Sequence, residues 1–141
     1  PAYLIYPTAT DAMRIDVDVW NLQAAGFAIM LGLDRDRQSL MALFVSPTSA
    51  KIESSNNAAF AVKATYTGTI GDSTWSFYYE PPTKTYTAMM NGVVVLTWTD
   101  TPGTEVPRGA NYRYGGVFLS RDASGVNGAE LDNFVLRDWK P

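Results

Sequence analysis

The sequence predicts an all-β fold, namely an antiparallel two-sheet β-sandwich or jelly roll with about ten or more strands and little helix. Nearly every segment either alternates apolar and polar residues or forms a short apolar run rich in β-branched and aromatic residues. Gly, Pro, Asn, Asp or Ser bound these segments, and no stretch repeats apolar residues with the period of a helix over three turns. We therefore expect one β-sandwich domain over residues 1–141.

The candidate strands differ in which of their faces are apolar. In the first strand Ile15, Val17 and Val19 share one face, because neighbouring side chains of a strand point to opposite sides. In the runs GFAIMLGL (26–33) and SLMALFVS (39–46), the residues on both faces of the strand are instead apolar. This pattern favours central strands covered on both sides. In chain order the candidates are Ala12–Trp20, Gly26–Leu33, Ser39–Ser46, Ala50–Ser54, Ala59–Thr67, Thr74–Glu80, Lys84–Asn91, Val93–Thr99, Tyr112–Arg121 and Ala129–Trp139.

A tight turn at Asn91-Gly92 joins two of these strands, because both residues tolerate the positive φ that a type I′ turn needs. The predicted register pairs Met90 with Val93, Met89 with Val94, Ala88 with Val95, Thr87 with Leu96, Tyr86 with Thr97 and Thr85 with Trp98. We interpret this hairpin mainly as scaffold. Its far end lies beside the segment 99–111, where Pro and Gly residues predict a loop, and loops often carry binding sites.

Composition excludes several classes of function. The chain has no cysteine and no histidine, which excludes disulfides, Cys-ligated zinc and Ser-His-Asp catalysis, so an enzyme would depend on Asp and Glu. The net charge of −3, without a run of Lys or Arg, predicts no nucleic-acid partner, and no apolar run approaches the roughly 20 residues that membrane insertion requires. Because the chain begins with Pro and lacks a basic n-region, we interpret it as an excised domain.

The second half of the chain resembles concanavalin A-like lectin/glucanase domains, a group that includes laminin-G-like domains. The resemblance lies in WSFYYEPPTKTYTAMMNGVVVLTWTD (75–100), YRYGGVFLSRD (112–122) and AELDNFVLRDW (129–139). These sequence motifs are most similar to those of domains at the C-terminus of minor tail proteins of phages that infect actinobacteria. The resemblance implies a jelly roll on a virion tail, outside the cell, that contacts a host cell-surface glycan or another envelope component. It also implies other tail proteins as partners and a homo-oligomer, such as a trimer, through the parent protein.

We predict a ligand site where aromatic side chains meet the 99–111 loop, because a sugar ring binds to a flat apolar face flanked by hydrogen-bonding groups. Tyr112 and Tyr114 share one strand face there, and the alternative is that Tyr114 belongs to the core. The predicted ligand-binding residues are Trp98, Tyr112, Tyr114, Thr85 and Arg121.

Three further groups of carboxylate-containing residues are candidates for a metal or catalytic site. Calcium, the one cofactor that the sequence suggests, prefers oxygen ligands, and its candidates are Asp122, Asn127 and Asp100, with Asp72 as an alternative to Asp100. The loop Asp34-Arg35-Asp36-Arg37 is better interpreted as a turn whose charges cancel. Asp16 and Asp18 have the strand spacing of a glycoside hydrolase pair, but the third acid of that pattern is missing, which favours a solvated strand face.

The leading hypothesis is therefore a non-catalytic carbohydrate-binding or host-surface-binding domain of a phage tail protein. A structural or oligomerisation domain of the tail is the alternative, motivated by apolar residues such as Trp139. A glycoside hydrolase is a third possibility. Nucleotide-binding enzymes are excluded, because no Gly-rich phosphate loop follows a strand and opens a helix.

Overall fold

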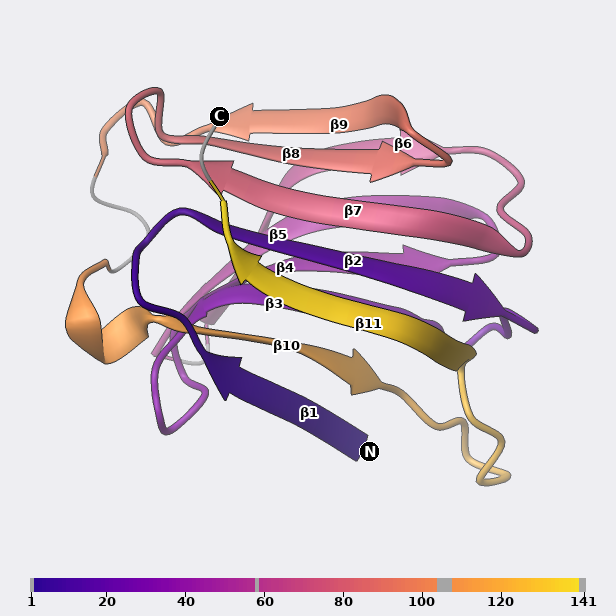
Figure 1. Cartoon of the computed structure of the whole chain (residues 1–141). Coiled ribbons are helices and arrows are strands. Elements are labelled where there is room, and N and C mark those ends of the chain that lie inside the picture. The colour runs from indigo at the N-terminus through magenta and orange to yellow at the C-terminus, as the bar shows by residue number, and fades with distance from the viewer. Residues whose placement is uncertain (1, 58, 104–107, 140–141) are drawn as a thin grey trace.

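The structure, a computed structural model, describes residues 2–57, 59–103 and 108–139, and these residues confirm the all-β prediction. Their strands form two antiparallel sheets, one of six strands and one of five, and Figure 1 shows the five-stranded sheet in front of the six-stranded sheet. The fold is a jelly-roll β-sandwich. No helix in the described part of the chain is long and apolar enough to cross a membrane.

All ten predicted strands are confirmed, and their ends lie within two residues of the predicted bounds. One further strand, β1, was not predicted. A short 3₁₀ helix, η1 (Ala110–Tyr112), lies where the sequence predicted the start of the strand that is now β10. The strands are β1 (Ala2–Pro7), β2 (Met13–Trp20), β3 (Phe27–Leu33), β4 (Leu40–Ser46), β5 (Ser49–Asn56), β6 (Ala59–Thr67), β7 (Ser73–Glu80), β8 (Thr85–Met90), β9 (Val93–Thr99), β10 (Tyr114–Leu119) and β11 (Glu130–Asp138).

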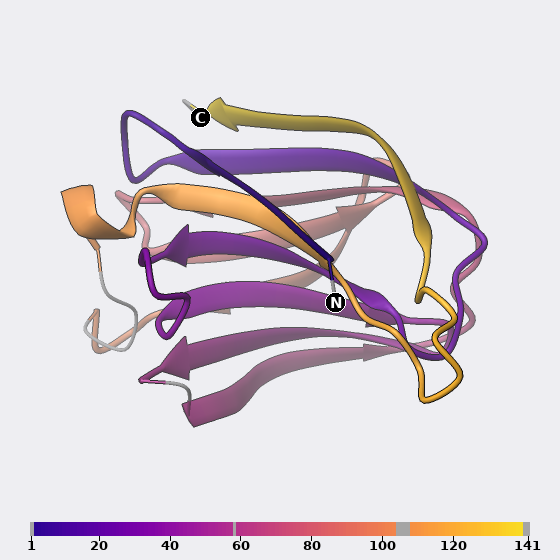
Figure 2. The same cartoon turned by 90° about the horizontal axis from the view of Figure 1, so that it is seen from below.

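The order of strands differs from their order in the chain. The six-stranded sheet runs β1-β10-β3-β4-β5-β6, and the five-stranded sheet runs β11-β2-β7-β8-β9. Figure 2 shows β10, β3, β4, β5 and β6 side by side from below. β1 lies at the edge of its sheet and pairs with β10 alone, and it ends at Pro7, a residue that a central strand would not tolerate.

The main core lies between the two sheets. Ile15, Val17 and Val19 of β2 are buried there, as their alternation predicted, and Trp75 and Phe77 of β7 are fully buried beside them. The six-stranded sheet contributes the alternate residues Phe27, Ile29, Leu31, Met41, Leu43 and Val45. These contacts explain why one of the two faces of β3 and β4 is apolar.

The other parity of β3 and β4 faces away from the five-stranded sheet. We call this side the outer face of the six-stranded sheet. The prediction that β3 and β4 are central strands covered on both sides is confirmed, because residues on both of their faces are buried. A second apolar cluster occupies the outer face, and its buried members are Ala28, Met30, Leu33, Leu40 and Ala42.

The hairpin prediction is confirmed at the turn and wrong beyond it. Asn91 and Gly92 have φ values of 51° and 79°, and Met90 and Met89 pair with Val93 and Val94 as predicted. A β-bulge then shifts the register, because β9 carries one extra residue between Val94 and Leu96. Trp98 consequently lies opposite Tyr86, and Thr85 lies opposite Thr99.

A charged network closes the end of the sandwich where β9 finishes. Asp100 is 0% exposed and accepts hydrogen bonds from Arg108 (3.0 Å) and from the amide of Gly103 (3.0 Å). The guanidinium of Arg108 lies 4.8 Å from the centre of the Tyr79 ring. The described parts of the predicted 99–111 loop are therefore tied to the core. Residues 104–107 of that loop lie outside the described residues.

Buried tyrosines pack beneath this network. Tyr79 stacks on Tyr86 with ring centres 4.5 Å apart, and Tyr86 stacks on Trp98 at 5.9 Å. Burial raises the pKa of Tyr79 to about 12, against the opposing charge of Arg108, and burial also raises the pKa of Tyr86. Both side chains are neutral in the folded protein at physiological pH.

We expect Asp100→Ala to lower the free energy of unfolding by about 3 kcal/mol, because it leaves the partly buried Arg108 guanidinium without its carboxylate. Urea denaturation at pH 7 measures this change. The matched control is Arg121→Ala, which removes an exposed contact to Asn127 and should change stability by less than about 0.5 kcal/mol. Equal stability of the two variants would show that the network is not structural.

The raised tyrosine pKa values predict the alkaline limit of stability. Unfolded tyrosines ionise near pH 10, whereas Tyr79 in the folded chain ionises near 12. The neutral Tyr79 side chain therefore contributes its full stabilisation of the folded state below pH 10. This contribution is lost as the pH rises from 10 towards 12. Urea midpoints measured across this range, together with tyrosinate absorbance, check the prediction. Ionisation of every tyrosine near pH 10 without unfolding would contradict it.

Candidate functional site

The outer face of the six-stranded sheet carries rows of side chains that cross neighbouring strands. Directly opposite residues in an antiparallel sheet point to the same face, so the ladder pairs define each row. One row crosses β1, β10, β3, β4 and β5 and contains Tyr3, Phe118, Ala28, Phe44 and Lys51. The next row crosses the same strands and contains Ile5, Gly116, Met30, Ala42 and Glu53.

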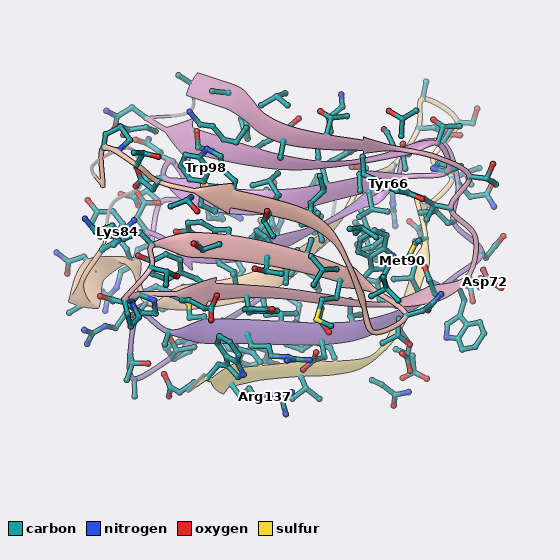
Figure 3. All side chains as sticks on the ribbon, turned by 90° about the horizontal axis from the view of Figure 1, so that it is seen from above. Tyr66, Asp72, Lys84, Met90, Trp98 and Arg137 are labelled. Carbon is teal, nitrogen blue, oxygen red and sulfur yellow. The ribbon has the colours of Figure 1, made fainter. Side chains whose placement is uncertain are left out.

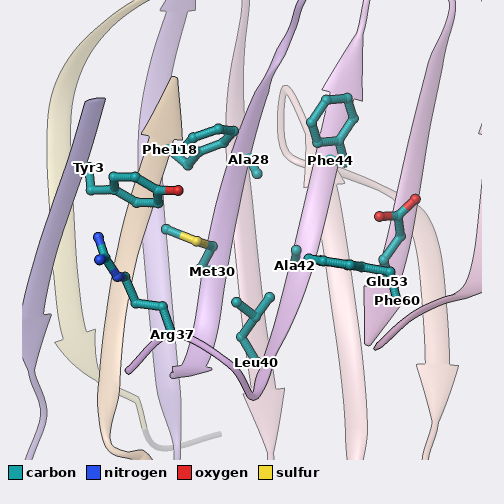
Figure 4. A pocket seen from close by; sticks show the side chains of 10 residues that line it. All are labelled: Tyr3, Ala28, Met30, Arg37, Leu40, Ala42, Phe44, Glu53, Phe60 and Phe118. Carbon is teal, nitrogen blue, oxygen red and sulfur yellow. The ribbon is translucent and has the colours of Figure 1, made fainter. Parts of the chain in front are cut away.

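Small residues lie among large ones in these rows, Ala28 in the first and Gly116 and Ala42 in the second, and the side chains leave a hollow of about 370 Å³, which we call the groove. Ala28 and Ala42 form its floor with Met30 and Leu40, and Figure 4 shows Tyr3 and Phe118 on one side, with Phe44 and Phe60 on the other. The Tyr3 and Phe118 rings lie 4.8 Å apart. Phe60 is 66% exposed, so its ring is available to a ligand, whereas the Tyr3 residue is 47% exposed and its ring already contacts Phe118 and Arg37. A groove of this volume is within the range of small-molecule sites.

Two charged side chains lie at the rim of the groove. The guanidinium of Arg37 lies 4.7 Å from the centre of the Tyr3 ring, a cation–π contact that fixes it beside β1. Glu53 lies on β5, opposite Ala42, and within the described residues its carboxylate has no hydrogen-bond or ion-pair partner. The groove thus joins an apolar floor to the charged groups of Arg37 and Glu53 and to Tyr3, whose hydroxyl can donate and accept.

The loop between β3 and β4 positions Arg37. The Asp34 carboxylate accepts hydrogen bonds from the amides of Gln38 (2.8 Å) and Ser39 (3.3 Å), which closes the loop as a turn. Arg37 adopts a φ of 58° within this turn. The sequence interpretation of Asp34–Arg37 as a turn is therefore confirmed. Its two arginines face different partners, because Arg35 contacts Tyr114 rather than Tyr3.

Tyr112 and Tyr114, two of the predicted ligand-binding residues, lie together in a second hollow. This hollow has a volume of about 230 Å³ and is also lined by Asp34, Arg35 and Asp36. Arg35 donates a hydrogen bond of 3.2 Å to the Tyr114 hydroxyl. The loop between β3 and β4 separates the second hollow from the groove, since it contributes side chains to both.

The other three predicted ligand-binding residues lie elsewhere. Trp98 packs against the main core between β9 and β6 and contacts Lys63, whose ammonium lies 5.4 Å from the ring centre (Figure 3). The expectation that Trp98 and Thr85 share a face is wrong because of the bulge, and the Thr85 hydroxyl instead hydrogen-bonds that of Thr99. Arg121 lies in the loop that follows β10 and donates a hydrogen bond to Asn127.

The calcium candidates are also separated. Asp122 and Asn127 lie in the loop between β10 and β11, where Asp122 accepts hydrogen bonds from the amides of Ser124 and Val126, and Asn127 binds Arg121. Asp100 lies at the other end of the sandwich, and Asp72 binds the amide of Asn21. No group of three acidic residues that could hold a metal ion occurs in residues 2–57, 59–103 and 108–139.

Asp16 and Asp18 lie on the exposed face of the five-stranded sheet and are both held by hydrogen bonds. Burial would raise the pKa of Asp16, but hydrogen bonds from Arg14 and Ser76 and the charges of Arg14 and Arg137 outweigh it, so this pKa is lowered. Hydrogen bonds from Thr74 and Asn133 lower the pKa of Asp18. A retaining glycosidase needs a carboxylic acid of raised pKa as proton donor. This pair does not provide one.

Comparison with solved structures identifies the fold. Over 96% of this chain, sheep galectin-11 superposes with a TM-score of 0.66 at 6% identity, and 98% of that chain is covered. A homodimeric agglutinin from chicken liver gives 0.62 at 10% identity, covering 96% of this chain and 99% of that one. The carbohydrate-binding module CBM66 from Bacillus subtilis superposes with a TM-score of 0.60 at 14% identity. The match covers 95% of this chain and 81% of that one.

These structures share the jelly-roll sandwich with this chain, and at such identities the likeness shows the fold alone. No protein-family model matches the sequence, and no curated protein matches it. The groove residues were missed by the sequence analysis. The available signal was the second apolar parity of β3 and β4, which indicated burial and did not show that part of this face remains open.

We expect Asp16→Asn to lower the free energy of unfolding at pH 7 by about 1–2 kcal/mol, because it removes the carboxylate charge that pairs with Arg14 and Arg137. Asp16 has a lowered pKa when folded, so its contribution is present above the unfolded pKa near 3.9 and disappears as the pH falls through the folded pKa. Wild type and variant should converge near pH 2. The exposed Asp36→Asn is the matched control, and a pH-independent difference for Asp16→Asn would refute this role.

Proposed function

We propose that this chain is a non-catalytic carbohydrate-binding domain that holds its ligand in the groove on the outer face of the six-stranded sheet. The observation that carries the proposal is the combination of exposed ring faces with few charged groups. Phe60 offers an exposed aromatic ring and Tyr3 a half-exposed one, while Arg37 and Glu53 offer hydrogen-bonding groups at the rim. Sugar rings have an apolar face and hydroxyl edges, so they match this arrangement.

The comparisons support the same class of function. Solved proteins with this fold include a galectin, an agglutinin and a carbohydrate-binding module, as their names state. The lowered pKa values of Asp16 and Asp18 argue against the hydrolase alternative. We therefore carry binding without turnover to this chain as the proposed activity.

We further propose that the domain acts on a phage tail and contacts a glycan of the host envelope. The support for this part is the resemblance of residues 75–139 to C-terminal domains of actinobacteriophage minor tail proteins. The extracellular location, the association with other tail proteins and trimerisation through a parent protein belong to the same proposal.

A subunit contact is the second candidate function, and one feature of β6 favours it. This strand lies at the edge of the six-stranded sheet, and its Phe60 and Val62 are 66% and 55% exposed. Exposed apolar edge strands are templates for pairing with another chain. Light scattering tests this candidate, since a monomer at every concentration would exclude pairing through β6.

We expect Phe60→Ala to weaken glycan binding about tenfold or more, a loss of ~1.4 kcal/mol or more, because it removes an exposed ring face of the groove. A glycan array identifies a ligand, and calorimetry of that ligand measures the change. Val93→Ala is the matched control, because Val93 is equally exposed but lies on the other sheet.

The second hollow is the alternative location for the ligand. The sequence predicted a site at Tyr112 and Tyr114, and Tyr112→Ala tests this proposal. Loss of binding in Tyr112→Ala with unchanged binding in Phe60→Ala would move the site from the groove to the second hollow. Unchanged binding in both variants would remove both sites.

A further inference from the structure

We infer that the groove selects a saccharide in which some hydroxyls are capped by small apolar groups, such as O-methyl or O-acetyl. This inference rests on the proposed function and specifies its ligand class. It starts from the floor, where Ala28, Met30, Leu40 and Ala42 are each only 4–6% exposed and none of these side chains forms hydrogen bonds.

The backbone beneath the floor is equally unable to bind a hydroxyl. β3 pairs with β10 and β4, and β4 pairs with β3 and β5, so the amides and carbonyls of both strands are engaged in sheet ladders. A hydroxyl pressed against this floor would lose its hydrogen bonds to water and form none in return. The methyl group of an O-methyl or O-acetyl cap has no hydrogen bonds to lose at the same position, and it buries apolar area there.

The rim fixes where free hydroxyls are accepted. Glu53 is an acceptor when ionised, so it binds a hydroxyl that donates, and Arg37 donates to a ring oxygen, a hydroxyl or an acetyl carbonyl. These two groups come from the β5 side and from the loop beside β1. The preferred ligand is therefore apolar in the middle and polar at its two ends.

Other occupants satisfy only part of this pattern. A plain alkyl chain matches the floor but leaves Glu53 and Arg37 without partners. An extended peptide would place its own amides and carbonyls over a floor that has no partner for them. A sugar with every hydroxyl free matches the rim but not the floor. A partly capped saccharide matches both.

The test is a glycan array in which each oligosaccharide backbone is printed in three forms: free, partly O-methylated and partly O-acetylated. We expect capped forms to bind about tenfold or more tightly than their free parents, the selectivity that an apolar pocket gives for one such group. Calorimetry of the best matched pair confirms the ratio.

Two floor and rim variants make the test specific. Ala42→Ser adds a hydroxyl to the floor with little change in volume, so it should reduce the preference for capped forms while Phe60→Ala weakens all forms alike. Glu53→Gln should weaken binding and leave the preference for capped forms unchanged. Circular dichroism and thermal melting confirm that each variant is folded.

The outcomes separate this inference from the proposed function. If free and capped glycans bind equally, and Phe60→Ala still weakens both, the groove binds sugars without selecting caps and the inference is overturned. If no glycan binds in any form, the proposed function itself fails. Binding of a fatty acid in the absence of glycan binding would overturn both.

Discussion

The apolar contact between the inner faces of the two sheets is the constraint on which the rest of the structure depends. Trp75 and Phe77 pack there against the alternate residues of β3 and β4, and their burial fixes which side of every strand is available to solvent. Because strand side chains alternate strictly, the same contact turns Ala28, Met30 and Ala42 outward. The groove is thus a direct consequence of how the core is packed.

The outer face of the six-stranded sheet combines buried apolar residues with an open groove. Its floor is as dry as the main core, although no second layer covers it among the described residues. Neighbouring rings provide the cover, and the small side chains of Ala28 and Ala42 prevent those rings from filling the space. The two-sheet fold is shared with a galectin and a carbohydrate-binding module that differ almost completely in sequence, so the shape of the groove is set by these side chains rather than by the architecture.

Much of the fold could be predicted from local pattern, because alternation and turn residues depend on near neighbours. Ile15, Val17 and Val19 are buried as expected, and Asn91-Gly92 turns as expected. The bulge at Val95 could not be predicted, since it depends on how β9 packs across the sandwich, and it moved Trp98 inward. The groove was missed for a related reason: its lining comes from β1, β3, β4, β5, β6, β10 and one loop, and only the strand order brings them together.

The position of β1 has a consequence for how the groove is assembled. β1 reaches the six-stranded sheet only through β10, which follows it by more than a hundred residues and lies between it and β3. Tyr3 therefore takes its place opposite Phe118 only after these residues have been synthesised and β10 has docked. The groove is in this sense a late product of folding: a partly folded chain can bury its centre and still lack one wall of the groove.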